Sequence, residues 1–176
     1  MDFYICVSPC PSVVKKTMTA EQDKLFMAIA LEEARKAGAR DEVPIGAVLV
    51  HTETGDIIAR NGNRTIETND PSAHAEILVI REGCAKANAQ RIPECDLYVT
   101  LEPCAMCAAA ISFARIRRIV YGAPDPKGGG VDHGPRFYSQ PTCHHRPAVT
   151  GSVLAESCGA VLQDFFRAKR AAQKSL

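Results

Sequence analysis

Apolar residues recur at two spacings along the chain, and the longer spacing predicts helices. From Thr19 to about Gly38 they lie three or four positions apart with charged residues between them, as in a helix with one buried face. Thr19 and Gln22 match the capping box that starts many helices. A second helix is predicted from Ser72, as its N-cap, to near Asn88.

Two more helices are predicted in the second half of the chain. Pro103 stands where proline is favoured, in a first helical turn, and strong helix formers follow it. The last helix is expected from about Leu154 to Arg170, and its end is basic. Its apolar positions are expected to be buried: Leu154, Val161, Leu162 and Phe165.

Short runs of apolar and β-branched residues predict strands at residues 44–51, 56–61, 96–101 and 117–122. The first two are joined by a turn and are expected to pair antiparallel. The last two flank the helix that begins at Pro103, which is typical of a parallel, right-handed βαβ unit. The order of elements therefore predicts an α/β domain. After it comes a long loop rich in glycine and proline, and such loops are typically functional.

The composition is that of an ordinary globular domain. Hydrophobic residues make up 46% and charged residues 23% of the 176 positions, enough for one domain with a core. The net charge is only +1, so a polyanionic partner would have to meet a local basic patch. No apolar run approaches the roughly 18 residues of a membrane span.

The first 17 residues differ from the rest of the chain. Their apolar run is short, Pro9 and Pro11 interrupt it, and Lys15 and Lys16 follow it, which is not the order of a signal peptide. We expect a disordered tail or an upstream start at residues 1–17, one domain at residues 18–176, and a cytoplasmic protein with free thiols.

The candidate chemistry lies at two predicted helix starts. Cys104 and Cys107 open one helix and His74 opens another. One imidazole and two thiolates leave the fourth position of a tetrahedral zinc ion open to water, as in catalytic sites. Helix N-termini favour the thiolate forms. Glu76, two residues after His74, can reach the same cavity as a proton shuttle. Glu102, just before the cysteines, is left either as a hydrogen-bond acceptor near the metal or without a role.

Other interpretations of the same residues stay open. A Cys-x-x-Cys pair also occurs in redox proteins. A structural zinc site would need a fourth protein ligand, but it would not need a carboxylate two positions after the histidine. That ligand, or a second metal site, would come from Cys143, His144 and His145. A further basic group is either a solvated helix end or a phosphate track: Arg115, Arg117 and Arg118.

The motif "HAE" at 74–76 followed by "PCAMC" at 103–107 resembles the signature of zinc-dependent nucleobase deaminases. Stretches such as "DEVPIGAVLV" and "VLAESCGAVLQDFFRAKR" resemble one branch, the bacterial tRNA adenosine deaminases of the TadA type, over nearly the whole chain from Met18. The resemblance implies a three-layer α/β/α fold of the cytidine-deaminase type. It also implies a mixed, mostly parallel five-stranded sheet and a homodimer.

The resemblance further implies hydrolysis of adenosine to inosine at the wobble position of a tRNA, in bacteria an arginine tRNA. Zinc hydroxide would attack C6 of the adenine, with Glu76 as the proton shuttle. By the same match, Asn63 would hold the target nucleotide and Asp125 would meet its neighbour. Phe165 and Arg167 would belong to a helix that grips the anticodon loop.

Two departures from that branch keep rival functions open. His144 stands where asparagine is usual, and the segment "FYSQPTC" is not general to the branch. One alternative is therefore a deaminase of a free base or nucleoside, such as guanine, cytosine or cytidine. A non-catalytic, zinc-stabilised nucleic-acid-binding module is a second. The basic end of the last helix favours tRNA, since a small-molecule enzyme has little need of Arg167, Lys169 and Arg170 there.

Overall fold

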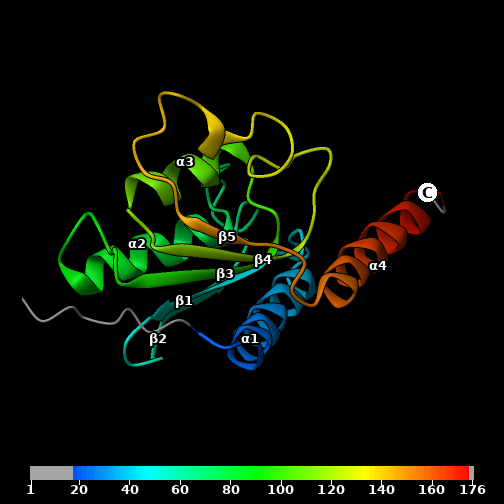
Figure 1. Cartoon of the computed structure of the whole chain (residues 1–176). Coiled ribbons are helices and arrows are strands. Elements are labelled where there is room, and N and C mark those ends of the chain that lie inside the picture. Colours follow the sequence, from blue (N-terminus) through cyan, green and yellow to red (C-terminus); the bar gives the residue numbers. More distant parts are fainter. Residues whose placement is uncertain (1–17, 175–176) are drawn as a thin grey trace, which may run out of the picture.

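The computed structural model describes residues 18–174, in which a single five-stranded sheet lies between two layers of helices (Figure 1). The strands are β1 (Gly46–His51), β2 (Ile57–Gly62), β3 (Cys95–Leu101), β4 (Arg118–Ala123) and β5 (Ala148–Thr150). The helices are α1 (Ala20–Ala39), α2 (Ala75–Ala87), α3 (Ala105–Phe113) and α4 (Ala155–Lys174), with a short 3-10 turn, η1 (Phe137–Ser139). The expectation for residues 1–17 lies outside the described residues.

The sheet is mixed, as predicted, with the order β2-β1-β3-β4-β5. β1 runs antiparallel to β2 and to β3, whereas β4 runs parallel to β3 and to β5. Strands β2, β3, β4 and β5 therefore run the same way and only β1 is reversed, so the predicted mixed, mostly parallel sheet is confirmed. α2 connects β2 to β3 and α3 connects β3 to β4. Both helices therefore begin at the same end of the sheet, where the parallel strands finish.

Each face of the sheet has its own apolar core, so the predicted three layers are confirmed. α2 and α3 cover one face, where Leu97 and Val99 of β3 are fully buried. α1 and α4 cover the other (Figure 1), where Tyr98 of β3 is fully buried and packs against Phe26 of α1. Gly46 lets α1 approach closely, since a Cβ there would lie 2.1 Å from the carbonyl oxygen of Ala30.

The start of α1 is confirmed, but α2 begins later than predicted. Thr19 and Gln22 form the expected capping box. Ser72 does not cap α2, because Asp70 holds it in a turn by accepting hydrogen bonds from its backbone N–H and its hydroxyl, at 2.8 and 2.7 Å. His74 is the N-cap residue instead.

The end of the chain differs most from the prediction. Leu154 precedes α4 in a left-handed conformation (φ 53°), and α4 buries only Cys158 among its described residues. The other apolar positions expected in the core, Val161, Leu162 and Phe165, are half-buried. The reason is that α4 packs on the inner strands β3 and β4 and on α1, and its C-terminal end extends away from the sheet (Figure 1).

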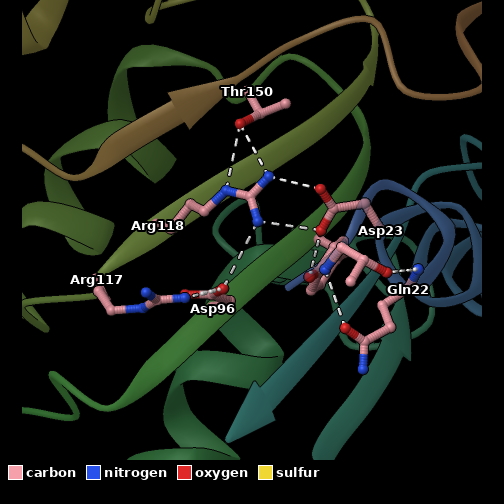
Figure 2. A network of polar contacts seen from close by, with 8 residues as sticks. Gln22, Asp23, Asp96, Arg117, Arg118 and Thr150 are labelled. Atoms are coloured by element: carbon pink, nitrogen blue, oxygen red, sulfur yellow. Dashed lines mark hydrogen bonds and ion pairs between the residues drawn. The ribbon is translucent and has the colours of Figure 1, made fainter. Parts of the chain in front are cut away.

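A buried ionic network joins α1 to strands β3, β4 and β5 of the sheet (Figure 2). Arg118, at the start of β4, donates to both carboxylate oxygens of Asp23 on α1, at 3.1 and 2.6 Å. It also donates to the Thr150 hydroxyl of β5, at 3.2 and 3.0 Å. Tyr98 donates its hydroxyl to Asp23 at 2.8 Å. The guanidinium is thus fully engaged inside the protein.

The neighbouring Arg117 is engaged in the same way. It makes a two-pronged ion pair with the fully buried carboxylate of Asp96, at 2.9 and 2.6 Å. The interpretation of this basic group as a phosphate track or a solvated helix end is therefore wrong for Arg117 and Arg118, because buried carboxylates of the core hold both side chains.

None of the helices among residues 18–174 combines the length and apolarity that crossing a membrane requires.

Candidate metal centre

Three side chains of ligand type meet where α2 and α3 begin. His74 is the N-cap of α2, Cys104 is the N-cap of α3, and Cys107 lies one turn into α3. The His74 Nδ1 atom is 3.8 Å from the Cys104 Sγ and 3.5 Å from the Cys107 Sγ. All three ligand atoms lie within 4.8 Å of one another, and residues 18–174 contain no other such group. The structure thus brings the three predicted ligands together.

The three side chains shift one another's pKa values. The hydrogen bond from Cys107, together with His74, lowers the pKa of the Cys104 thiol to about 4. The same bond raises the pKa of Cys107, which keeps its proton. Contact with Cys104 raises the pKa of the His74 imidazole. A bound dication would take the place of these protons, because metal-coordinating thiols deprotonate.

Glu76 lies in the first turn of α2 and is only 4% exposed. Its Oε2 is the one buried side-chain oxygen or nitrogen in the described part of the chain that has no hydrogen-bond partner. Burial raises the pKa of this carboxyl. A buried carboxylate with an unpaired oxygen is costly and is typical of functional sites. Together with one imidazole and two thiolates, it fits an open zinc site with a neighbouring acid–base group.

Asn63 lies beside this cluster, immediately after β2. Its side chain is buried, and its Oδ1 accepts a hydrogen bond from the backbone N–H of Ala75 at 2.9 Å. It therefore supplies the side-chain cap of α2 that His74 does not provide. Through this bond Asn63 is tied to the residue that follows the ligand His74. The capping role was not predicted from the sequence.

Two buried glutamates organise the loops on either side of the cluster, and no sequence pattern marks either role. The first is Glu42, which accepts hydrogen bonds from the backbone N–H groups of Ile66 and Glu67, both at 2.9 Å, and from the Thr65 hydroxyl at 3.0 Å. Burial would raise the pKa of Glu42, but these donors outweigh it and lower the pKa. Glu42 thus fixes the loop that follows Asn63.

The second is Glu102, next to the metal-binding motif. Its carboxylate accepts five hydrogen bonds: from the backbone N–H groups of Asp125, Val131, Asp132 and His133, at 2.9 to 3.2 Å, and from the His133 ring at 2.6 Å. Burial would raise the pKa of Glu102, but the donors from Asp125 and His133 lower it overall. Glu102 thus fixes the loop that follows β4.

Asp125 acts as a turn residue in that loop. Its Oδ1 accepts hydrogen bonds from the backbone N–H groups of Lys127 and Gly128, both at 3.0 Å. The side chain is half-buried and tied to Glu102 through its own backbone. The turn reading of Asp125 is therefore observed, and a contact with substrate stays a prediction.

The two predicted residues of α4 are separate from the cluster. Arg167 is exposed and pairs with Asp164 at 2.9 Å. Phe165 packs against Phe166, and the Lys169 Nζ lies 5.6 Å from the centre of its ring. A cleft of about 470 Å³ beside α4 is lined by Lys127, Leu162, Gln163, Phe166, Arg167 and Arg170. Phe166 therefore lines the basic cleft, and Phe165 does not.

The alternative ligands of the Cys143–His145 segment serve another purpose. The His145 ring donates to the Ile116 carbonyl at 2.6 Å, and its own carbonyl accepts from the Ser112 hydroxyl at 2.8 Å. Cys143 donates to the same carbonyl, and His144 is exposed. These residues anchor the loop to α3. Within residues 18–174 they form neither a second metal cluster nor a fourth ligand.

Comparison with known proteins shows the family. Residues 20–123, which include all three ligands, match the cytidine and deoxycytidylate deaminase zinc-binding region. A tRNA-specific adenosine deaminase of Agrobacterium fabrum is 63% identical over 145 residues, 82% of this chain and 94% of the relative. The chain belongs to the zinc-dependent deaminases, in the tRNA-specific adenosine deaminase family. The deaminase of that name from Bacillus subtilis is 45% identical over 159 residues, 88% of this chain and 98% of the relative.

Solved structures agree with this assignment. A structure from a study of A-to-I editing by tRNA:A34 deaminases matches the deaminase with a TM-score of 0.76 and 62% identity, over 78% of this chain and 99% of that one. The guanine deaminase of Nitrosomonas europaea matches with a TM-score of 0.72 but 22% identity, over 94% and 97% of the two chains. The second likeness shows the fold alone. The predicted cytidine-deaminase fold and zinc dependence are thus confirmed.

Proposed function

We propose that this deaminase converts adenosine to inosine at the wobble position of a tRNA, in bacteria an arginine tRNA, in the cytoplasm. The observation that carries the proposal lies where α2 and α3 begin: three side chains of ligand type meet there, and the buried Glu76 of α2 has one carboxylate oxygen without a partner. The 63% identity to a protein named tRNA-specific adenosine deaminase supports the substrate.

The chemistry follows from the groups at the two helix starts. His74, Cys104 and Cys107 would hold zinc, which when bound supplies an acidified water for attack on C6 of adenine. Glu76 takes one proton from that water and delivers it to the ring nitrogen, then takes the second proton from the new C6 hydroxyl and delivers it to the departing amine. Water and adenosine become inosine and ammonia. Since Glu76 Oε2 has no other partner, it is free to exchange protons with the substrate.

Substrate contacts are proposed from the loops and α4. Asn63, tied to the start of α2, would hold the target nucleotide, and Asp125 would meet its neighbour. Phe165 and Arg167 would belong to the surface of α4 that receives the anticodon loop, beside the basic cleft. The anticodon loop is already single-stranded, which reduces the cost of a few kcal/mol for extruding a base.

The substrate proposal is tested by comparing RNA with free bases. The zinc-loaded protein is incubated with an arginine-tRNA anticodon stem-loop and, separately, with adenosine, cytidine and guanine. Inosine formed in the stem-loop alone is the expected result. Product from guanine or another free compound, with an unchanged stem-loop, would refute the tRNA proposal and support the small-molecule alternative, whose fold the guanine deaminase shares.

Removing charge from α4 is expected to weaken RNA binding and its salt dependence. Each phosphate contact to a single strand contributes about −0.7 to the slope of log K against log salt, so Arg170→Ala should flatten the slope by about that amount. Arg167→Ala should have a smaller effect, since Arg167 is paired with Asp164. The measurement is stem-loop affinity across salt concentrations. Slopes equal to that of the parent protein in both variants would show that this end of α4 does not contact phosphates.

A homodimer is proposed as well, and α3 supports it. This helix is apolar all round, yet Met106 is 39% and Phe113 is 69% exposed on its outer side. Such a helix is usually covered on every side. A second copy of the chain is the proposed cover, seated next to the ligands that α3 carries.

Phe113→Arg is therefore expected to produce monomers. A buried arginine opposite another copy of itself adds both a desolvation cost and like-charge repulsion. Leu25→Arg is the matched control, because Leu25 is also an exposed apolar residue (58%) but lies on α1. Sedimentation equilibrium reports the mass. A parent protein that is monomeric at all concentrations, or a Phe113→Arg variant that stays dimeric, would contradict this interface.

A further inference from the structure

Glu102 follows the last residue of β3 and precedes the first turn of α3 in the chain. Its side chain is fully buried. Every hydrogen bond that its carboxylate accepts comes from one loop, at residues 125–133. Oε2 accepts from Asp125 at the beginning of this loop and from the His133 ring, and Oε1 accepts from the backbone at the end of the loop, at Val131, Asp132 and His133. A single carboxylate therefore closes the loop on itself.

The loop also lies directly on the start of α3. The backbone N–H of Gly130 donates to the Pro103 carbonyl at 2.8 Å, and Gly129 pairs with Cys104 in an isolated β-bridge. A Cβ at Gly129 would lie 2.5 Å from the Glu102 Oε1, and a Cβ at Gly130 would lie 2.6 Å from the Ala105 nitrogen. The path of the loop is thus fixed by contact with the residues around the metal ligands.

The middle of the same loop reaches the surface proposed for RNA. Lys127 lines the basic cleft beside α4, and Asp125 holds the turn that leads to it. We propose that Glu102 is a positioning residue, which sets residues 125–133 as a preformed wall between the metal centre and the RNA surface. The identity of the ligand as RNA rests on the proposed function, whereas the shape of the wall does not.

A carboxylate suits this task better than any neutral side chain. It is an acceptor on both oxygens, so it can satisfy several N–H groups that converge on one point. Glutamine has almost the same shape, but its NH₂ group would face N–H donors and leave them unpaired. Glu102→Gln therefore removes the acceptor and keeps the volume.

Glu42 provides a matched comparison on the other side of the cluster. It holds the loop after Asn63 by the same kind of bonds, to Thr65, Ile66 and Glu67. Glu53 provides the neutral control, because it is exposed in the turn between β1 and β2. The three glutamine variants therefore differ only in which loop, if any, loses its acceptor.

Hydrogen–deuterium exchange tests the wall directly. In the parent protein the amides of Val131, Asp132 and His133 should be protected although they lie in a loop. Glu102→Gln should speed their exchange at least about tenfold, the effect of losing one hydrogen bond to a charged group, and leave Ile66 and Glu67 unchanged. Glu42→Gln should do the reverse, and Glu53→Gln should change neither set. Fast exchange of residues 131–133 in the parent protein would overturn the proposal.

Activity then separates positioning from general support. Glu102→Gln should keep one zinc per chain, raise the Kd for the anticodon stem-loop at least about tenfold, and retain most of kcat at saturating RNA. Loss of zinc together with binding, or parent-like binding, would overturn the positioning role. If Glu102→Gln does not fold, His133→Ala removes one contact, and a smaller rise in Kd is expected. A parent protein that binds no stem-loop would refute the proposed function, while the exchange pattern would still decide the role of Glu102.

Discussion

Glu76→Gln is expected to abolish deamination while the zinc centre stays in place. The variant keeps the shape of the side chain but can neither take up a proton from water nor pass one to the amine. A positioned acid–base group typically contributes a factor of about 10²–10⁴ in rate, so kcat should fall by at least that much. Zinc content should not change, since the three predicted ligands are His74, Cys104 and Cys107.

Stability provides an internal check on the same variant. Glu76 is buried with an oxygen that has no partner, so a neutral amide should not lower the unfolding temperature. Glu82→Gln, on the same helix but in a half-exposed pair with Lys86, is the control and should keep full activity. Inosine formation in the stem-loop, metal analysis and thermal unfolding complete the test. Parent-like kcat in Glu76→Gln would end the proton-shuttle mechanism.

Arg118→Met should cause a large loss of stability. Its guanidinium is the partner of the buried Asp23 carboxylate, and the two side chains are 11% and 8% exposed. Removing one member of a buried ion pair leaves the other charge buried without a partner, which typically lowers the free energy of unfolding by about 3–5 kcal/mol. Since a domain of this size loses about 2–4 °C per kcal/mol, the midpoint of thermal unfolding should fall by about 10 °C.

A second substitution distinguishes the cost of an unpaired buried charge from the cost of lost packing. Adding Asp23→Leu to Arg118→Met should recover part of the stability, because apolar pairs often replace buried ion pairs without cost. Lys86→Met breaks only an exposed pair with Glu82 and should leave the midpoint unchanged. Residual folded protein should keep its deaminase activity, since Arg118 lies at the start of β4, whereas the cysteine ligands follow the end of β3 and His74 starts α2. A midpoint of Arg118→Met equal to that of the parent would contradict this account.

The metal centre could be predicted from the sequence because its geometry is local. His74 and Cys104 each start a helix, and Cys107 follows one turn later, so short spacings determine where the ligands point. α2 follows β2 and α3 follows β3, and these two strands run the same way on either side of β1, so both helix starts lie at one end of the sheet.

The remaining features depend on contacts between distant residues, which no spacing reveals. β5 is only three residues long and forms a strand because β4 offers it a free edge. The sequence alone predicts an exposed Arg118. Its buried partner Asp23 is far away in the chain, and only the fold brings the two together. The apolar stripe of α4 predicts a buried face, but this helix packs only on β3, β4 and α1, and Cys158 is its one buried residue among those described. Glu102 gains its role only when the loop at 125–133 folds back onto it.

The cap that Asn63 places on α2 would couple the proposed zinc site to the target nucleotide thermodynamically. The buried side chain accepts a hydrogen bond from the N–H of Ala75, the residue next to His74, and is also the proposed contact of that nucleotide. A ligand that shifts Asn63 must then alter the affinity of the site for zinc. By reciprocity, zinc must alter the affinity for that ligand by the same factor. Zinc titrations with and without stem-loop RNA would give this coupling free energy directly, without measuring a single turnover.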